Sequence, residues 1–534
     1  MPPIKDFATK LDEMLTKTYP ADKPGAAVIV VRGGKILFRK GYGMANLELG
    51  VKVEPEMVFR LGSITKQFTA VCILMLLQQG RLDIHDEITR FLPDYPTGGR
   101  RITVEHLLTH TSGIKSYTDM PEWLPLWRKD MSLDEMIALF KDQPFGFEPG
   151  EQFLYNNSGY ILLGAIIEKA SGMSYADFVQ RNIFDALGMA HSCYDQTERI
   201  LPGRVSGYSK GTDGYINAPY LSMSQPYAAG ALASSVDDLA KWDAALYTDK
   251  LLPPDLLAKA WAPSKLNNGD STGYGYGWAV GEYEGLTFIE HGGGINGFAT
   301  DGVRVPAEKV YVAVLTNLDT PDPAPDMLAF KIAAMAVGHP LKEPVAIQVP
   351  AETLAGYAGV YQINEREDRI VTFQDGKLFS QRTGGLKYEF IPVGPDEFMI
   401  KDLLDRFFFV RDPQGKTTGM KVLRRMGPPE SAVWTDKPLP VPRQAIVLEP
   451  ALLERFPGTY ELAPGFALAI TLEDGQLHAQ APGQEKLKLF PETPERLFAK
   501  EVDLHFDFQF DPQGKVAECT LTQGPQVMPL KKVG

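Results

Sequence analysis

Cysteine and basic residues are scarce in this chain of 534 amino acids. It has three cysteines, Cys72, Cys193 and Cys519, which lie far apart. Disulfide bonds are therefore not required for folding, and a reducing compartment suits the chain. Aspartate and glutamate outnumber lysine and arginine by 67 to 54, so the net charge at pH 7 is −13. This charge argues against nucleic acid or an anionic membrane as a partner.

Several common sequence patterns are also missing. No apolar run is long enough to span a bilayer, and residues 1–6 do not combine a basic start with an apolar core. We therefore expect a cytoplasmic protein. There is no glycine-rich phosphate loop and no paired-cysteine metal pattern. His106 and His110 lack the glutamate of His-Glu-x-x-His and a third ligand, so we expect a packed helix end there, with no metal and no cofactor.

The length and the remaining composition are those of a globular protein with several domains. Apolar residues make up 44% of the chain and charged residues 23%, and 534 residues are too many for one hydrophobic core, so we expect about three domains. Residues 26–31 and 35–39 are predicted to form a β-hairpin, and residues 4–14 an amphipathic helix. Further strands and a closing helix are expected at residues 275–281, 286–289, 297–305, 310–315 and 327–337. Strands at both ends with helices between them predict an antiparallel sheet covered by helices, an α+β fold.

The chain beyond residue 340 contains an internal repeat. A shift of 99 positions places the pattern Leu-x4-Gly-x-Tyr at residues 354–361 on the same pattern at residues 453–460. The same shift places residues 412–416 on residues 511–515, both Asp-Pro-Gln-Gly-Lys. A constant offset without gaps indicates a duplication, and the short alternating strands predict two small antiparallel β-barrels. The expected limits of the catalytic domain, the linker and the two barrels are residues 1–341, 342–350, 351–445 and 446–534.

Ser63-Ile64-Thr65-Lys66 is the first motif that indicates chemistry. A serine hydroxyl group is a poor nucleophile at neutral pH unless a base lies beside it. If Ser63 opens a helix, Lys66 lies on the same face within hydrogen-bond reach of Oγ. The apolar residues that follow predict a buried helix ending near Gln79-Gly80, and burial lowers the pKa of a lysine. The motif alone is common, and a solvated helix turn is its usual structure.

Two later segments carry further candidate residues. Tyr155-Asn156-Asn157 precedes a helical run at residues 161–170, so that a tight loop can aim a phenol and an amide into a cleft. His291-Gly292-Gly293-Gly294 follows a strand-like run at residues 286–289. Glycines at a strand edge leave no side chains, so a substrate can approach closely. The alternatives are a core tyrosine beside an asparagine turn and a simple glycine turn.

Together, Ser63-x-x-Lys66, Tyr155-x-Asn157 and His291-x-Gly293 resemble the motifs of the serine β-lactamase and penicillin-binding peptidase superfamily. The likeness covers about residues 5–340. It is closer to the class C-like branch, which includes family VIII esterases and D-aminopeptidases. Further matching segments are residues 101–113, 229–235 and 274–278. The resemblance implies a β-lactamase-like catalytic domain, with an antiparallel sheet flanked by helices.

The resemblance also implies a role for each matching residue. Ser63 is the expected nucleophile, Lys66 its activating amine, and Tyr155 the residue that shuttles protons to the leaving group. Asn157 is expected to orient Lys66 and the substrate. The backbone N–H groups of Ser63 and Gly294 are expected to form the oxyanion hole, where one donor contributes about 3 kcal/mol to lowering the barrier.

One motif departs from the β-lactamases of this branch. They have Lys-Thr-Gly where this chain has His291-Gly292-Gly293, which we expect to contact substrate. A lysine offers a fixed positive charge to a substrate carboxylate, whereas a histidine is largely neutral at pH 7. The departure favours substrates without a free carboxylate near the scissile bond.

A catalytic domain followed by two barrels resembles the D-aminopeptidase architecture. In that architecture a loop of the last barrel limits the active site to substrates with a free amino terminus. The corresponding stretch is residues 481–486, where Glu485 is a candidate partner for an α-ammonium group, with a solvated turn as the alternative. Gly207-x-Ser209-x-Gly211 fits a nucleophile elbow, but its flanks predict a hairpin and no catalysis.

These observations predict a serine hydrolase that forms an acyl-enzyme on Ser63. The favoured activity is that of an amidase or aminopeptidase on small peptides or amino-acid amides, and D-configured substrates are among those considered. A carboxylesterase is the alternative, because the same groups hydrolyse esters. A penicillin-binding or scaffold protein with slow or no turnover is the alternative of another class. The expected partners are a small molecule or short peptide and, in a homo-oligomer, further copies of the chain.

Overall fold

The computed structural model describes residues 6–211, 214–342, 344–364, 367–401, 403–425, 429–441, 443–463, 466–481, 484 and 486–533. The chain forms two compact units. Of the described residues, 6–209 and 216–341 belong to the first, and 210–211, 214–215 and those from 342 onward belong to the second. No helix among the described residues has the length and apolar character needed to cross a membrane.

An antiparallel sheet forms the centre of the first unit. Its strand order is β10-β11-β12-β13-β1-β2, so strands from both ends of this unit pair with each other. The bounds are β1 Ala26–Arg32, β2 Lys35–Tyr42, β10 Ala279–Tyr283, β11 Leu286–Ile295, β12 Phe298–Val305 and β13 Val310–Thr316. The central strands β1 and β13 are rich in valine and buried along almost their whole length. Such strands are covered on both faces, which agrees with the expected α+β fold.

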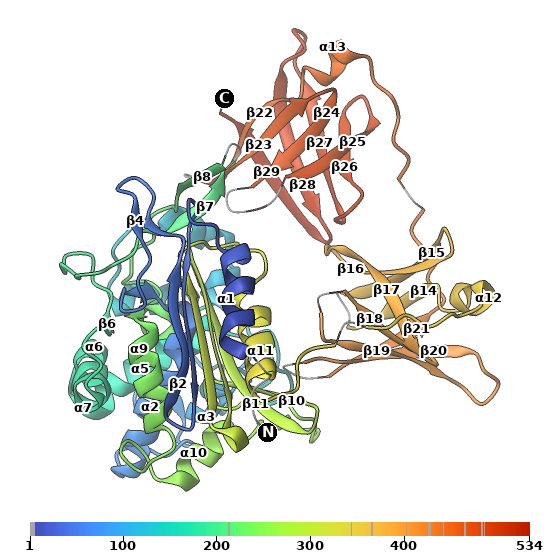
Figure 1. Cartoon of the computed structure of the whole chain (residues 1–534). Coiled ribbons are helices and arrows are strands. Elements are labelled where there is room, and N and C mark those ends of the chain that lie inside the picture. Colours follow the sequence, from blue (N-terminus) through green and yellow to red (C-terminus); the bar gives the residue numbers. More distant parts are fainter. Residues whose placement is uncertain are drawn as a thin grey trace. The chain divides into compact units, whose positions relative to one another are not determined.

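Helices cover both faces of this sheet (Figure 1). The helices α1 (Phe7–Thr18) and α11 (Pro325–Ala336) lie on one face, and α2 (Thr65–Gln78), α5 (Asn157–Ser171) and α9 (Val236–Ala245) lie on the other. In α1 the buried residues Phe7, Leu11 and Leu15 recur every four positions, the spacing of one helix face. The expected N-terminal helix, hairpin and closing helix are therefore present.

Smaller elements complete the first unit. Its further helices are η1 Gly62–Ile64, η2 Ile88–Arg90, α3 Val104–Leu108, η3 Tyr117–Asp119, η4 Pro121–Leu126, α4 Leu133–Phe140, α6 Tyr175–Val179, η5 Gln180–Phe184, α7 Asp185–Leu187, α8 Tyr227–Gly230, α10 Pro254–Trp261 and η6 Pro306–Glu308. Its further strands are β3 Met44–Asn46, β4 Val51–Lys52, β5 Phe59–Arg60, β6 Cys193–Tyr194 and β9 Leu232–Ser234. The strands β7 Tyr208–Gly211 and β8 Gly214–Asn217 form a separate hairpin.

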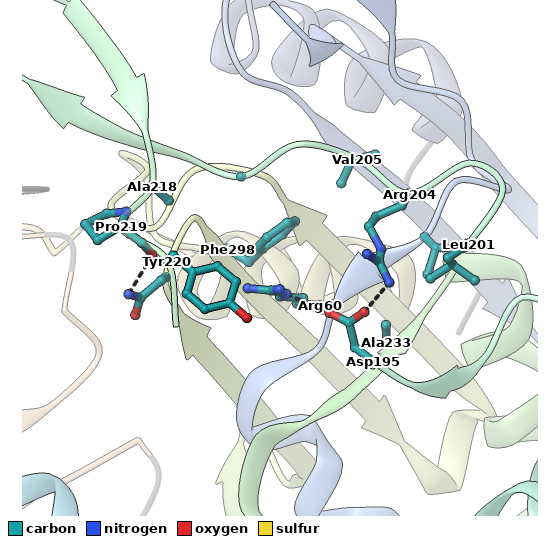
Figure 2. A pocket seen from close by; sticks show the side chains of 13 residues that line it. Arg60, Asp195, Leu201, Arg204, Val205, Ala218, Pro219, Tyr220, Ala233 and Phe298 are labelled. Atoms are coloured by element: carbon teal, nitrogen blue, oxygen red, sulfur yellow. Dashed lines mark hydrogen bonds and ion pairs between the residues drawn. The ribbon is translucent and has the colours of Figure 1, made fainter. Parts of the chain in front are cut away.

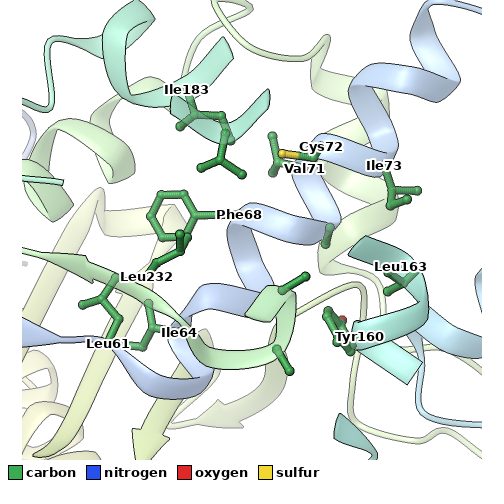
Figure 3. Close-up of a cluster of buried hydrophobic side chains, with 14 of the residues drawn as sticks. Leu61, Ile64, Phe68, Val71, Cys72, Ile73, Tyr160, Leu163, Ile183 and Leu232 are labelled. Carbon is green, nitrogen blue, oxygen red and sulfur yellow. The ribbon is translucent and has the colours of Figure 1, made fainter. Parts of the chain in front are cut away.

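Helix α2 lies in the middle of the hydrophobic core. Its residues from Thr65 to Leu76 are all buried, so every face of the helix packs against protein. Figure 3 shows Phe68 among aliphatic side chains that include Leu61, Ile183 and Leu232. Phe68 also stacks on Trp242, with ring centroids 4.2 Å apart. A helix held on all sides fixes the position of the residues at its N-terminus.

Two strand predictions need correction. The strand expected at residues 275–281 begins at Ala279, because the glycine-rich segment before it forms turns. The strand expected at residues 286–289 extends to Ile295, so the glycine run after His291 is not the simple turn that was the alternative. It lies inside β11 and pairs with β12, with Gly293 opposite Thr300. A run of glycines cannot show the alternation of apolar and polar side chains that usually indicates a strand.

The second unit contains two closed antiparallel barrels. The first barrel follows α12 Ala351–Ala355, and its strands are β14 Gly359–Gln362, β15 Asp368–Gln374, β16 Lys377–Arg382, β17 Lys387–Gly394, β18 Glu397–Ile400, β19 Arg406–Arg411, β20 Thr417–Leu423 and β21 Glu430–Thr435. The second follows α13 Pro450–Leu453, and its strands are β22 Gly458–Ala463, β23 Phe466–Glu473, β24 Gln476–Gln480, β25 Leu487–Thr493, β26 Arg496–Ala499, β27 Leu504–Phe510, β28 Val516–Gln523 and β29 Gln526–Lys532. The expected two barrels are confirmed, whereas the exact domain limits stay predictions.

Corresponding residues of the two barrels make the same local contacts. The hydroxyl group of Tyr361 donates to the carbonyl oxygen of Tyr357 at 2.6 Å, and that of Tyr460 donates to the carbonyl oxygen of Phe456 at 2.5 Å. In each Asp-Pro-Gln-Gly-Lys turn, the aspartate carboxylate accepts a hydrogen bond from the lysine N–H group at 2.8 Å. The sequence repeat is thus also a repeat of local structure.

Candidate active site

Ser63 and Lys66 lie where the chain enters helix α2. Ser63 is in the short turn η1, and Lys66 is in the first turn of α2. The Lys66 Nζ atom is 3.0 Å from Ser63 Oγ. Ser63 is partly exposed, whereas Lys66 has no exposed surface. The serine can therefore meet a ligand while the amine stays out of water.

The other contacts of Lys66 define what its amine can do. Nζ is 2.8 Å from Asn157 Oδ1 and 2.9 Å from the carbonyl oxygen of Ala229. Both oxygens are acceptors, so they take two N–H groups. Burial lowers the pKa of Lys66 well below its ordinary value. In the neutral amine the remaining lone pair faces Ser63 Oγ, and the amine can accept the serine proton.

Tyr155 and Asn157 come from the loop that opens helix α5. Asn156 caps this helix by accepting a hydrogen bond from the N–H group of Gly159 at 2.8 Å. Asn157 is the first helical residue, and its Nδ2 atom donates to Thr118 Oγ1 at 3.1 Å. This bond fixes the amide so that Oδ1, and not the NH2 group, faces Lys66.

The phenol of Tyr155 lies over Lys66. The ring centroid is 4.8 Å from Lys66 Nζ, and the hydroxyl oxygen is buried without a hydrogen-bond partner among the described residues. Burial raises the pKa of this phenol, and a weaker hydrogen-bonding contribution from the nearby Ser63 hydroxyl group lowers it. The hydroxyl group therefore stays protonated at neutral pH, beside the serine and the lysine.

Strand β11 passes directly beside the turn that carries Ser63. The hydroxyl group of Thr300 donates to the carbonyl oxygen of Leu61 at 2.8 Å, which ties the sheet to this turn. A β-carbon on Gly293 would lie 1.9 Å from the same Leu61 oxygen, and one on Gly62 would lie 3.0 Å from the Gly294 nitrogen. Glycine is thus required at 293 by the protein's own backbone, whereas a β-carbon on Gly294 would meet nothing within 4 Å, so the expected close approach of a substrate stays a prediction there.

His291 is a buried, neutral imidazole. Its Nδ1 atom is 2.6 Å from the carbonyl oxygen of Gly292, which is an acceptor, so Nδ1 carries the proton. Its Nε2 atom is 2.8 Å from the hydroxyl group of Tyr274 and therefore accepts from it. Burial lowers the pKa of His291 to about 3, with a smaller contribution from the positive charge of Lys66 in its protonated form, although the Gly292 carbonyl group raises it. The ring is 5.9 Å from that of Tyr155.

His110 is a neighbour of the site that the sequence interpretation left out. It follows α3 in a left-handed conformation, and its ring centroid is 4.4 Å from that of Tyr155. Its Nδ1 atom accepts a hydrogen bond from the N–H group of Asn156 at 3.0 Å. Burial lowers the pKa of His110 well below its ordinary value. The expected packed helix end is present, but His110 also holds the loop that carries Tyr155.

The pKa of His291 leads to a prediction for stability. The folded protein resists protonation of His291 down to about pH 3, whereas the unfolded chain binds the proton near pH 6.5. Stability is therefore full above pH 6.5 and is lost as the pH falls below it. Between pH 7 and pH 4.5, protonation of His291 in the unfolded chain lowers the free energy of unfolding by about 2.5 kcal/mol.

The measurement is urea unfolding of the first unit at both pH values. Tryptophan fluorescence can follow it, since every tryptophan except Trp434 lies in that unit. His291→Gln should lose about 2.5 kcal/mol less stability than the wild type on acidification. An equal loss in both proteins would contradict a neutral His291.

Two other candidate positions have different outcomes. Glu485, the candidate residue of the barrel loop, lies outside the described residues, and its gating role stays a prediction. Ser209 lies in strand β7, and its hydroxyl group donates to the carboxylate of Asp319. No nucleophile elbow is formed there, because β7 leads into a hairpin. Over the described part of the chain, no three acidic, histidine or cysteine side chains gather as metal ligands would.

Two models of known protein families match the chain, one over most of the first unit and one over part of the second. The family model described as "Beta-lactamase" matches residues 13–336. A second model, described as "Domain of unknown function (DUF3471)", matches residues 442–531, which include all but the last residue of the second barrel.

Individual proteins extend these matches. A penicillin-binding protein from Bacillus subtilis (strain 168) is 29% identical over 410 residues, which are 70% of this chain and 88% of that protein. The octameric penicillin-binding protein homologue from Pyrococcus abyssi has the same fold over 98% of this chain and 99% of its own, with a TM-score of 0.57 and 23% identity. The D-stereospecific amidohydrolase from Streptomyces sp. aligns with 61% of this chain and 98% of its own, with a TM-score of 0.53 and 26% identity.

Proposed function

Because the chain belongs to the β-lactamase family, a family of serine hydrolases, we propose that it hydrolyses amide bonds in small substrates through an acyl-enzyme on Ser63. The proposal rests on the contact between Ser63 Oγ and the buried Nζ atom of Lys66, which are 3.0 Å apart. A buried neutral amine is a suitable base for a serine hydroxyl group.

Acylation begins with transfer of the Ser63 proton to Lys66. Oγ attacks the substrate carbonyl carbon, and a bond forms as the carbonyl oxygen becomes an oxyanion. The backbone N–H groups of Ser63 and Gly294 donate to this oxygen, where the glycines at 62 and 293 allow the two segments to meet. Asn157 and Ala229 hold the amine in place during the transfer.

Collapse of this intermediate breaks the bond to the leaving group. An amine leaves only after it gains a proton, and the buried phenol of Tyr155 donates that proton to it. Lys66 then gives its own proton to Tyr155. Water next attacks the acyl carbon and loses its proton to Lys66, which returns it to Ser63 Oγ as the acyl bond breaks. The acid product leaves and the Ser63 hydroxyl group is restored.

One feature argues against β-lactams and peptide C-termini as substrates, and another supports an amide. The neutral His291 offers no fixed positive charge to the carboxylate of a β-lactam or a peptide C-terminus. The similar Streptomyces enzyme is a D-stereospecific amidohydrolase. A carboxylesterase remains the second candidate, because the same residues hydrolyse esters and an alkoxide leaves with less help.

A panel of chromogenic substrates tests the proposal. It comprises a p-nitrophenyl ester, D- and L-aminoacyl p-nitroanilides and a chromogenic cephalosporin, with Ser63→Ala as the matched control. We expect steady turnover of the anilides, faster for the D form. Turnover of the ester alone would indicate a carboxylesterase, and a stoichiometric burst on the cephalosporin alone would indicate a penicillin-binding protein.

A further inference from the structure

A cavity of about 170 Å³ lies in the first unit near the turn between β11 and β12 (Figure 2). Two arginines, Arg60 and Arg204, and the buried carboxylate of Asp195 are its charged lining residues. Arg60 Nε donates to one oxygen of Asp195 at 2.8 Å, and Arg204 Nη2 donates to the other at 2.5 Å. Figure 2 shows the two arginines approaching Asp195 from different sides, with Phe298 and Tyr220 beside them.

The charges that line this cavity do not balance. One carboxylate faces two guanidinium groups, which leaves one formal positive charge. Asp195 has 2% of its side chain exposed, whereas Arg60 has 20% and Arg204 33%. The anion that orients the arginines is therefore buried behind them, and the cations face the cavity. An arginine held in this way is well suited to bind a carboxylate.

The cavity lies close to Ser63 along two segments of chain. Arg60 precedes Ser63 by three residues, so their Cα atoms are at most about 11 Å apart. Asn296, another lining residue, follows Gly294 by two residues, so their Cα atoms are at most about 7 Å apart. A substrate whose carbonyl oxygen is bound at Gly294 can reach the cavity with a side chain of a few atoms.

The position of Tyr155 decides which part of the substrate reaches the cavity. Tyr155 lies beside His291, which precedes Gly294 on β11. The cavity lies past Gly294, at Asn296 and Phe298. Since the leaving group must meet Tyr155, the acyl group extends in the other direction, toward the arginines.

We propose that this cavity is an acyl-side subsite for a carboxylate, so that the preferred substrates carry an acidic acyl group of the glutaryl or glutamyl type. The inference rests on the proposed function, because it places the substrate by the acylation of Ser63. Phe298 and Leu201 give the methylene groups of such an acyl chain an apolar wall. Arg204 and Arg60 bind the carboxylate at its end.

A matched pair of esters tests the subsite. p-Nitrophenyl hydrogen glutarate and p-nitrophenyl valerate have acyl chains of equal length that differ in a terminal carboxylate. We expect Arg204→Gln to lower the ratio of their kcat/KM values by about 10- to 100-fold, and Arg204→Lys to restore part of it. Intrinsic differences in ester reactivity cancel, because the ratio is compared between proteins. Arg199→Gln, a change of an exposed arginine in the same loop that does not line the cavity, should leave the ratio unchanged.

A second measurement needs no variant. Free glutarate should inhibit the wild type at least about 10-fold more strongly than valerate, and 0.5 M NaCl should weaken this preference. An unchanged ester ratio in Arg204→Gln, or equal inhibition by the two acids, would overturn the subsite. If neither ester acylates Ser63, the proposed function itself fails, which mass spectrometry of the protein distinguishes from a failure of the subsite.

Discussion

Replacing Lys66 with methionine is expected to lower kcat/KM by about four orders of magnitude while the protein stays folded. Methionine fills nearly the same volume but cannot accept the Ser63 proton. It leaves Asn157 Oδ1 and the Ala229 carbonyl oxygen without their donor, so we also expect a loss of about 1–3 kcal/mol of stability. Turnover of an aminoacyl p-nitroanilide gives the rate, and circular dichroism confirms the fold.

Lys169→Met is the matched control for this change. Lys169 is an exposed lysine on α5, so the control repeats the chemical change away from the site. Activity within about 10-fold of the wild type in Lys66→Met would contradict the role of its amine as the base.

Replacing Tyr155 with phenylalanine is expected to separate amide from ester substrates. The ring and its contacts with Lys66 and His110 remain, and only the hydroxyl group is lost. An amine leaving group then lacks its proton donor, so anilide turnover should fall by about 10³-fold. p-Nitrophenolate leaves without a proton, so turnover of a p-nitrophenyl ester should fall by less than about 10-fold.

Tyr160→Phe is the control for the loss of a buried hydroxyl group. The Tyr160 ring also faces Lys66, with 5.4 Å between the ring centroid and Lys66 Nζ. However, the Tyr160 hydroxyl group donates to the Leu108 carbonyl oxygen. This variant should lose about 1 kcal/mol of stability and keep the wild-type ratio of anilide to ester turnover. An equal loss of both activities in Tyr155→Phe would assign Tyr155 a structural role in place of proton delivery.

The sequence was most informative where contacts are local. Ser63 and Lys66 meet because residues three positions apart share a helix face, which a pattern of spacing can predict. The two barrels were predictable because the duplication has kept a constant offset, so each turn and strand could be compared with its copy. Even there, the buried pair of Arg369 and Glu430, 2.7 Å apart, depends on β15 and β21, which both pair with β14 where the barrel closes.

Contacts between distant segments were harder to predict. The carbonyl oxygen of Ala229 accepts from Lys66 only because α8 packs against α2, and no side chain at 229 indicates it. His110 was interpreted as a packed helix end, which is correct but incomplete, since its place beneath Tyr155 depends on how α3 and α5 pack. The strand before the glycine run is predicted to end at residue 289, and not at Ile295, because glycines carry no strand pattern of their own.

The central claim is that hydrolysis passes through an acyl group on Ser63, and trapping that acyl group tests it most directly. The protein would be mixed with a p-nitrophenyl ester, quenched in acid within the first turnover, weighed intact and digested for peptide mapping. We expect a mass increase equal to one acyl group, located on the peptide that contains Ser63 and absent from Ser63→Ala. An acyl group on Ser209, or undiminished turnover by Ser63→Ala, would contradict the claim.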